Sequence, residues 1–359
     1  MFYLTDRYLT RQFAINLFIA IVTWIIIFLV VDIIEHISKF LDRGATLGQF
    51  TLYYLYYTPY IISLTLPVAM LLATLFSLST FAQNNEIVAQ LSSGISLYRI
   101  LSPLFILAFL ISIAAGFFNE IVVPEANQRR YDIYRYEISK NPRTSGTSRS
   151  NIYIQDSANR KFVIKYFNSK SNEASTVSIQ TFKGAVLVER LDAKKMTWKD
   201  SHWVLNDGIV RDFSKDQETI YTFTDSTLNE SRITPENLID IQKKPEEMSF
   251  AELNRFISEL KSIGADVRKW LVERHLKIAM PFTNFIVVLL GAPLASRKRR
   301  GGIGLNFGLS LLVSFIYFII IRTGQVFGHQ GTLDPFIGAW LGNLIFVSLG
   351  LVSLFSVQK

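Results

Sequence analysis

Long apolar stretches occur in two blocks, one at each end of the chain, with a more polar segment between them. A helix that crosses a lipid bilayer needs about 20 predominantly apolar residues. Six stretches meet this requirement, three in each block: Phe13–Val31, Tyr60–Phe81, Leu101–Phe118, Ile278–Leu294, Ile303–Ile321 and Phe336–Phe355. The pattern predicts a polytopic α-helical membrane protein with six transmembrane helices, three in residues 1–120 and three in residues 266–359.

The intervening segment, residues 121–265, has the pattern of β-structure. Its apolar runs are short, rich in β-branched and aromatic residues, and bounded by Asn, Asp, Gly and Ser. These runs are 152–154, 161–167, 176–182, 185–191, 202–207 and 219–225. Strands at this spacing predict an inserted all-β domain of the sandwich, barrel or jelly-roll type.

Two local signals refine this picture of the insert. Asn206-Asp207-Gly208 lies between apolar runs and predicts a hairpin turn. Residues 249–263 predict a helix, with Ser249 as N-cap and Glu252 completing a capping box.

The composition supports a membrane protein. Half of the 359 residues are hydrophobic and the formal net charge is +8, which is too apolar for an ordinary soluble domain. Most of the basic excess flanks the apolar stretches, where it indicates orientation or contact with anionic lipid. No basic run is interleaved with aromatic residues, as a nucleic-acid interface would need. The chain has no cysteine, so disulfides and cysteine-based metal sites are excluded.

The basic residues also predict the orientation of the chain. Arg297-Lys298-Arg299-Arg300 occupies the short loop between the fourth and fifth stretches, and the positive-inside rule assigns this loop to the cytoplasm. Both termini are then cytoplasmic and the insert lies outside, which agrees with Arg7 and Arg11 before the first stretch. A second basic group, at the outer edge of the fourth stretch, runs against the rule: Arg268, Lys269, Arg274 and Lys277.

Motifs for catalysis are missing from the sequence. It contains no G-x-x-x-x-G-K-[ST] phosphate loop and no G-x-S-x-G nucleophile elbow, and its four histidines are scattered. We therefore expect no catalytic residue, no metal site and no cofactor in this chain.

Residues 84–96 (NNEIVAQLSSGIS) have a helical period. Ile87, Leu91 and Ile95 fall on one side, and Glu86 and Gln90 fall on another. A short amphipathic helix on the membrane surface would be a natural docking element. An ordinary connecting helix is the other interpretation.

Several segments resemble the permeases of the lipopolysaccharide-export ABC transporter, the LptF/LptG family. Besides residues 84–96, the resemblance rests on DRYL near the start and on the W-x-L-x-D-G piece at Trp203–Gly208 of the insert. The remaining matching segments are DIIEHISKFLDRG (32–44), LPVAMLLATLF (66–76), ERHLKIAMPF (273–282), LLGAPLASRKRR (289–300) and HQGTLDPFIGAWLGN (329–343). They occur in the family's order on both sides of a β insert.

This resemblance implies a fold, partners and a location. The family has six transmembrane helices and a periplasmic jelly-roll domain between the third and fourth. Two such permeases pair and sit on a dimer of cytoplasmic ABC ATPases, which supply the ATP hydrolysis. The complex extracts lipopolysaccharide from the outer leaflet of the Gram-negative inner membrane and passes it to a periplasmic bridge protein with a membrane anchor. Residues 84–95 would be the coupling helix, with Glu86, Ile87, Gln90 and Leu91 as ATPase-coupling residues.

Charged residues after the first stretch allow two interpretations. Asp32, Glu35, Lys39, Asp42 and Arg43 are spaced by threes and fours, so ion pairs such as Glu35–Lys39 could solvate a helix end. Alternatively, Lys39 and Arg43 attract lipid A phosphates.

The basic group before the fourth stretch raises the same question. Arg268, Lys269 and Arg274 would supply further phosphate contacts, or would pair with Asp266 and Glu273. For the whole chain, the alternative to a permease is a membrane scaffold or sensor that binds a periplasmic partner through its β domain.

Overall fold

The computed structural model describes residues 4–139, 149–157, 159–168, 171–184, 186–214, 218–228, 231, 233–235, 238, 244–262, 266–296 and 303–356. The chain divides into two compact units. We call Met1–Ser139 with Arg268–Lys359 the helical unit, and Lys140–Val267 the β unit.

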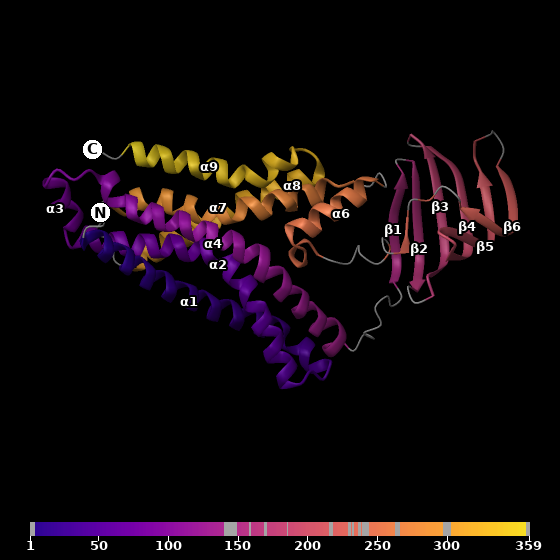
Figure 1. Ribbon diagram of the computed structural model, residues 1–359, viewed down its shortest axis with the longest axis horizontal. Coiled ribbons are helices and arrows are strands. Elements are labelled where there is room, and N and C mark those ends of the chain that lie inside the picture. The colour runs from indigo at the N-terminus through magenta and orange to yellow at the C-terminus, as the bar shows by residue number, and fades with distance from the viewer. Residues whose placement is uncertain are drawn as a thin grey trace. The chain divides into compact units, whose positions relative to one another are not determined.

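Long helices build the helical unit (Figure 1). Six described helices are long and apolar enough to cross a membrane, which confirms the predicted transmembrane architecture. They are α1 (Leu4–Asp42), α2 (Leu47–Gln83), α4 (Leu97–Asp132), α7 (Arg268–Ser296), α8 (Ile303–Gln330) and α9 (Pro335–Phe355). The short α3 (Glu86–Ser92) joins α2 to α4.

Several helices are longer than the apolar stretches that predicted them. With 39 residues and a rise of 1.5 Å per residue, α1 is about 58 Å long, roughly twice the thickness of the hydrocarbon core. Its polar ends therefore extend beyond the apolar layer.

The end of α4 corrects the expected boundary of the insert at residue 121. The helix continues to Asp132, and one π-helical turn, η1 (Ile133–Ile138), follows it directly. Beyond the apolar stretch, Arg129 Nη2 lies 3.1 Å from Glu125 Oε1 one turn earlier, an arrangement that supports a helix in water. The helix therefore continues beyond the apolar stretch, and the β unit begins further along the chain than residue 121.

The helices α7, α8 and α9 form a closely packed block. Between α8 and α9, a Cβ on Gly338 would lie 2.8 Å from the carbonyl oxygen of Gly324, so the two backbones touch. Small residues allow this approach in lipid, where packing replaces the hydrophobic effect. Thr283 of α7, Tyr317 of α8 and Asn343 of α9 are buried together, with 2.6 Å between the Thr283 and Tyr317 hydroxyl oxygens. The Asn343 amide also donates to the Ala279 carbonyl at 2.8 Å.

Burial differs sharply among the long helices. In the most apolar part of α2, 78% of the residues are buried within the chain, against 11% in α1. One side of α1 is not covered by the rest of the chain, and large apolar side chains such as Phe18, Ile19 and Ile26 are exposed there. The helix α2 therefore lies at the centre of the helical unit, and α1 lies at its periphery.

A single antiparallel sheet forms the body of the β unit (Figure 1). Each described strand pairs with the next in sequence, and all six predicted strand segments fall on strands, which confirms the inserted all-β domain. The connectivity of the described strands is a meander. The strands are β1 (Arg149–Ser157), β2 (Arg160–Asn168), β3 (Glu173–Lys183), β4 (Val186–Lys199), β5 (His202–Asp212) and β6 (Thr219–Leu228).

Trp203 lies on the buried face of this sheet, near the start of β5. Its side chain is fully buried, and its ring meets those of Phe167 and Trp198 edge-on. The indole nitrogen donates to the carbonyl of Ile233 at 2.7 Å, so the polar atom of this large side chain is satisfied in the core.

The prediction of a hairpin turn at Asn206-Asp207-Gly208 was wrong. These residues lie inside β5, where Asp207 has a φ of 50° and the pairing with β4 and β6 keeps its register on either side. Gly208 is required because a Cβ there would collide with the ring of Phe223. The turn between β4 and β5 is instead made by Asp200 and Ser201, which both have positive φ, as a type I′ hairpin demands.

The helical segment of the β unit is capped as predicted. The short η2 (Pro245–Glu247) precedes α6 (Phe250–Ser262). The backbone amide of Ser249 donates to Glu252 Oε2 at 2.8 Å, and the Glu252 amide donates to Ser249 Oγ at 3.2 Å. This reciprocal pair is a capping box.

The contact between Gly324 and Gly338 leads to a stability prediction. Gly324→Ala places a methyl group against the α9 backbone, and such overpacking costs about 1–3 kcal/mol. We expect the purified protein to unfold at a lower temperature in detergent. Gly308→Ala on the same helix is the control, because nothing lies within 4 Å of that position. Equal unfolding temperatures for the two variants would contradict the close packing of α8 and α9.

Candidate coupling site and lipid-contact site

The first candidate site is the reversal that contains α3. Asn84 ends α2, and Asn85 turns the chain with a φ of 58°, a conformation that Asn tolerates better than most residues. After α3, Gly94 takes a φ of 84° and Ser96 caps α4, accepting from the Arg99 amide at 3.4 Å. These turns place α3 at one end of the helical unit, near the start of α1 and the end of α9 (Figure 1).

The two sides of α3 differ from the predicted pattern. Ile87 is 2% exposed and belongs to the core cluster that includes Phe81 and Leu97. Leu91 and Ile95, predicted to share its side, are exposed, and Ile95 lies beyond the end of the helix at Ser92. The reason is length: a helix of seven residues anchors one apolar side chain in the core and leaves the next turn outside.

The polar residues of α3 lie at the edge of this surface. Glu86 and Gln90 are half-buried. The Asn84 side-chain amide donates to Glu86 Oε1 at 3.2 Å, which orients the carboxylate. Val88 is exposed together with Leu91 and Ile95. We call Val88, Leu91 and Ile95 the apolar face of the α3 segment.

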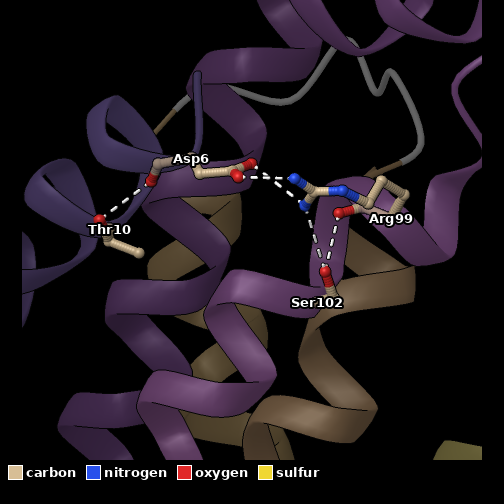
Figure 2. Close-up of polar contacts among 4 residues, drawn as sticks. All are labelled: Asp6, Thr10, Arg99 and Ser102. Atoms are coloured by element: carbon tan, nitrogen blue, oxygen red, sulfur yellow. Dashed lines mark hydrogen bonds and ion pairs between the residues drawn. The ribbon is translucent and has the colours of Figure 1, made fainter. Parts of the chain in front are cut away.

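An ion pair next to α3 was missed by sequence reasoning. Figure 2 shows the carboxylate of Asp6 on α1 facing the guanidinium of Arg99 on α4. The two N–O distances are 2.7 Å and 3.3 Å, and the Asp6 side chain is 8% exposed. Arg99 also donates to Ser102 Oγ at 3.4 Å. Asp6 belongs to the DRYL motif, but its partner is 93 residues away and no local pattern identifies it.

The second candidate site lies at the opposite end of the helical unit, where α1 ends (Figure 1). Lys39 is exposed there. Arg43 donates to Ser139 Oγ, and its guanidinium lies 5.0 Å from the centre of the Tyr134 ring. The structure therefore fixes Arg43 against the end of the third spanning segment and leaves Lys39 projecting.

The acidic residues of this group are arranged differently from the predicted ion pairs. Among the described residues, Glu35–Lys39 is not an ion pair. Asp32 accepts instead from the Tyr54 hydroxyl at 2.9 Å, and His36 Nδ1 lies 3.5 Å from the Asp32 carboxylate.

A buried arginine joins the helices behind these residues, and this too was missed. Arg130 of α4 is 6% exposed, and its guanidinium lies 4.2 Å from the ring centre of Tyr57 and 4.4 Å from that of Tyr131. Tyr53 and Tyr60 surround it at 5.8 Å. Cation–π contacts of this kind hold a desolvated guanidinium, so the cluster ties α2 to α4 at this end.

The basic residues at the start of α7 are spread along the helix. Arg268 and Lys269 are exposed, and the Lys269 ammonium lies 5.6 Å from the centre of the Trp270 ring. Arg274 is half-buried, with Nη2 3.3 Å from His275 Nε2. Glu273 accepts hydrogen bonds from two residues of α8, Gln325 at 2.6 Å and His329 at 3.1 Å.

No group of three or more potential metal ligands occurs among the residues that the structure describes. The polar groups of the two candidate sites lie at the two ends of a bundle of apolar helices. A sheet domain is inserted between its third and fourth spans. These features define a multi-pass membrane protein with an inserted β domain.

Comparison with known proteins identifies the family. The model of the family described as "Lipopolysaccharide export system permease LptF/LptG" matches residues 7–355, and the chain belongs to this family. It is 22% identical over 331 residues to the permease protein LptG of Escherichia coli K12, covering 88% of this chain and 89% of that protein. It is 21% identical over 350 residues to LptG of Haemophilus influenzae, covering 95% of each. It is 29% identical over 89 residues to LptF of Escherichia coli K12, which is 25% of this chain and 24% of that protein.

Proposed function

We propose that the chain is a permease subunit of an ABC transporter that extracts lipopolysaccharide from the outer leaflet of the inner membrane. It would pass the lipid to a periplasmic bridge protein that leads toward the outer membrane. Membership of the LptF/LptG family supports this function, as do relatives that are named lipopolysaccharide export permeases. A sister permease of the same family would complete the membrane part.

The apolar face of the α3 segment is the observation that carries the proposal. Three exposed apolar side chains on a surface segment, next to a half-buried carboxylate at Glu86, have the character of a protein contact. A dimer of cytoplasmic ATPases would bind this face, and its basic groups would meet Glu86. The helix would then transmit closure of the nucleotide sites to α2 and α4, with Ile87 as its anchor in the core.

The orientation follows from this assignment. The α3 end of the helical unit is cytoplasmic, as are both termini, and the β unit is periplasmic. Arg7 and Arg11 near the start of α1 support this orientation through the positive-inside rule. The basic loop Arg297–Arg300, on which the prediction first rested, lies outside the described residues.

The opposite end of the unit would receive the lipid. Lys39 projects from the end of α1, and Arg43 lies one turn further on. Lipid A phosphates carry the charge that these cations attract. Arg268, Lys269 and Arg274 on α7 would add contacts at the same level. The exposed apolar side of α1 suits the acyl chains or the sister permease.

The β unit would pass the lipid on. Its last described strand, β6, exposes Ile220 and Tyr221. A strand of this kind can pair with a partner's sheet, which suits a bridge protein built of β-structure. A scaffold or sensor that binds a periplasmic partner would use the same surface, and is distinguished by having no ATPase bound to α3.

Charge reversal at Glu86 tests the coupling role. Glu86→Lys places a cation against the basic groups proposed for the ATPase. We therefore expect export of lipopolysaccharide to fall by about tenfold or more, which corresponds to a loss of about 1.4 kcal/mol or more in binding free energy. The measurement is release of lipopolysaccharide from proteoliposomes that contain both permeases and the ATPase. Glu125→Lys, on an exposed part of α4 away from α3, is the control. Intact assembly and export in Glu86→Lys would refute the coupling role.

Charge reversal at Lys39 tests the lipid site. Lys39→Glu turns an attraction for phosphate into a repulsion, and each basic residue near an anionic lipid surface is worth about 1 kcal/mol. We therefore expect photo-crosslinking of lipopolysaccharide to the end of α1 to decrease by at least about fivefold. Arg7→Glu, near the α3 end of the same helix, should leave the crosslink unchanged. A crosslink that survives in Lys39→Glu and Arg43→Glu would exclude the phosphate contact.

A further inference from the structure

The first turn of α4 connects α3 to two other helices. Only Ser93 to Ser96 separate the end of α3 from the start of α4. In that turn, the Tyr98 hydroxyl donates to the carbonyl of Leu354 on α9 at 3.3 Å, and Arg99 binds Asp6 on α1. Adjacent residues therefore contact helices from opposite ends of the chain.

The contact with α1 is the stronger and more directional of the two. Arg99 uses Nη1 and Nη2 for the two oxygens of Asp6, so the pair resists both sliding and rotation (Figure 2). The Asp6 side chain is 8% exposed, whereas that of Arg99 is 39% exposed. The carboxylate is thus largely removed from solvent, and this guanidinium is a charge partner that compensates its burial.

The helix α1 is also attached to its neighbours at other points. Its buried apolar residues are Leu9, Phe13, Leu17, Ala20 and Phe40. Asn16 also donates to Ser77 of α2 at 2.8 Å. Four of these five apolar residues lie in the half of the helix nearest α3, and the following apolar stretch is mostly exposed. The part of α1 that packs into the helical core is therefore the part next to the ion pair, whereas its contacts further along include those of Asp32 with Tyr54 and of Phe40 with Phe50.

We propose that Asp6 and Arg99 are a pair of positioning residues that transmits movement of the α3 segment to α1. When α3 moves, the first turn of α4 moves with it, and the ion pair carries α1 along. The most exposed spanning helix is then driven from its α3 end, which couples the ATPase cycle to rearrangement of the helix that faces lipid. This inference rests on the proposed function of α3 and adds a route by which its movement reaches α1.

The test compares the yield of transport with the rate of ATP hydrolysis. The complete complex with the sister permease and ATPase is placed in proteoliposomes, and lipopolysaccharide released per ATP hydrolysed is measured. Asp6→Asn keeps the side chain's shape and removes its charge. We expect it to lower the lipid released per ATP by at least about fivefold, the lower end of typical coupling strengths, while the complex assembles and hydrolyses ATP. The exchange Asp6→Arg with Arg99→Asp should restore at least half of the ratio.

Glu125→Gln is the matched control. It removes another carboxylate–arginine pair, with Arg129, from an exposed part of the same helix α4. We expect its ratio of lipid to ATP to equal that of the unaltered complex.

The possible results separate the two proposals. An unchanged ratio in Asp6→Asn, a proportional loss of hydrolysis and export, or failure of the complex to assemble would overturn the coupling role of the pair and leave an anchor for α1 only. These results would leave the role of α3 standing if Glu86→Lys still lowers export as expected. Intact assembly and export in Glu86→Lys would instead overturn the coupling role of α3, on which this inference rests.

Discussion

The interior of a bilayer offers no water to backbone amides and little hydrophobic force between helices, and this constraint governs the structure. Each span must satisfy its own backbone, so only long helices cross. What holds them together is close packing and a small number of polar contacts. In the block of α7, α8 and α9, these are the glycine contact between Gly324 and Gly338 and the buried group of Thr283, Tyr317 and Asn343.

The same constraint explains why α1 stands apart. It buries few residues, and the contacts of Asp6 with Arg99 and of Asn16 with Ser77 also attach it to its neighbours. Its most apolar stretch therefore lies largely outside the packed core. The proposed transport function uses the contrast: a fixed block of helices on one side, and on the other a helix that α3 can drive through α4.

Sequence alone predicted the elements of the fold that depend on composition. The six spans follow from apolar length, and the six strands from short β-branched runs. Features that depend on distant partners were not predictable. The Asp6–Arg99 pair joins residues 93 positions apart, and the tyrosines around Arg130 come from two helices. Local signals also gave a wrong prediction. Asn206-Asp207-Gly208 has the composition of a hairpin turn, but in the structure it lies inside β5, where Asp207 has a positive φ. At α3, the helical spacing of apolar residues predicted the helix correctly. It also predicted that Leu91 lies on the same side as the buried Ile87, whereas Leu91 is exposed.

The central claim is that the α3 segment binds the ATPase, and site-specific crosslinking measures this most directly. The chain has no cysteine, so Leu91→Cys introduces a single thiol on the apolar face of the α3 segment. In membranes that contain the full complex, the account predicts a crosslink from this position to the ATPase whose yield changes when ATP is added. A crosslink to other proteins only, with none to the ATPase, would contradict it.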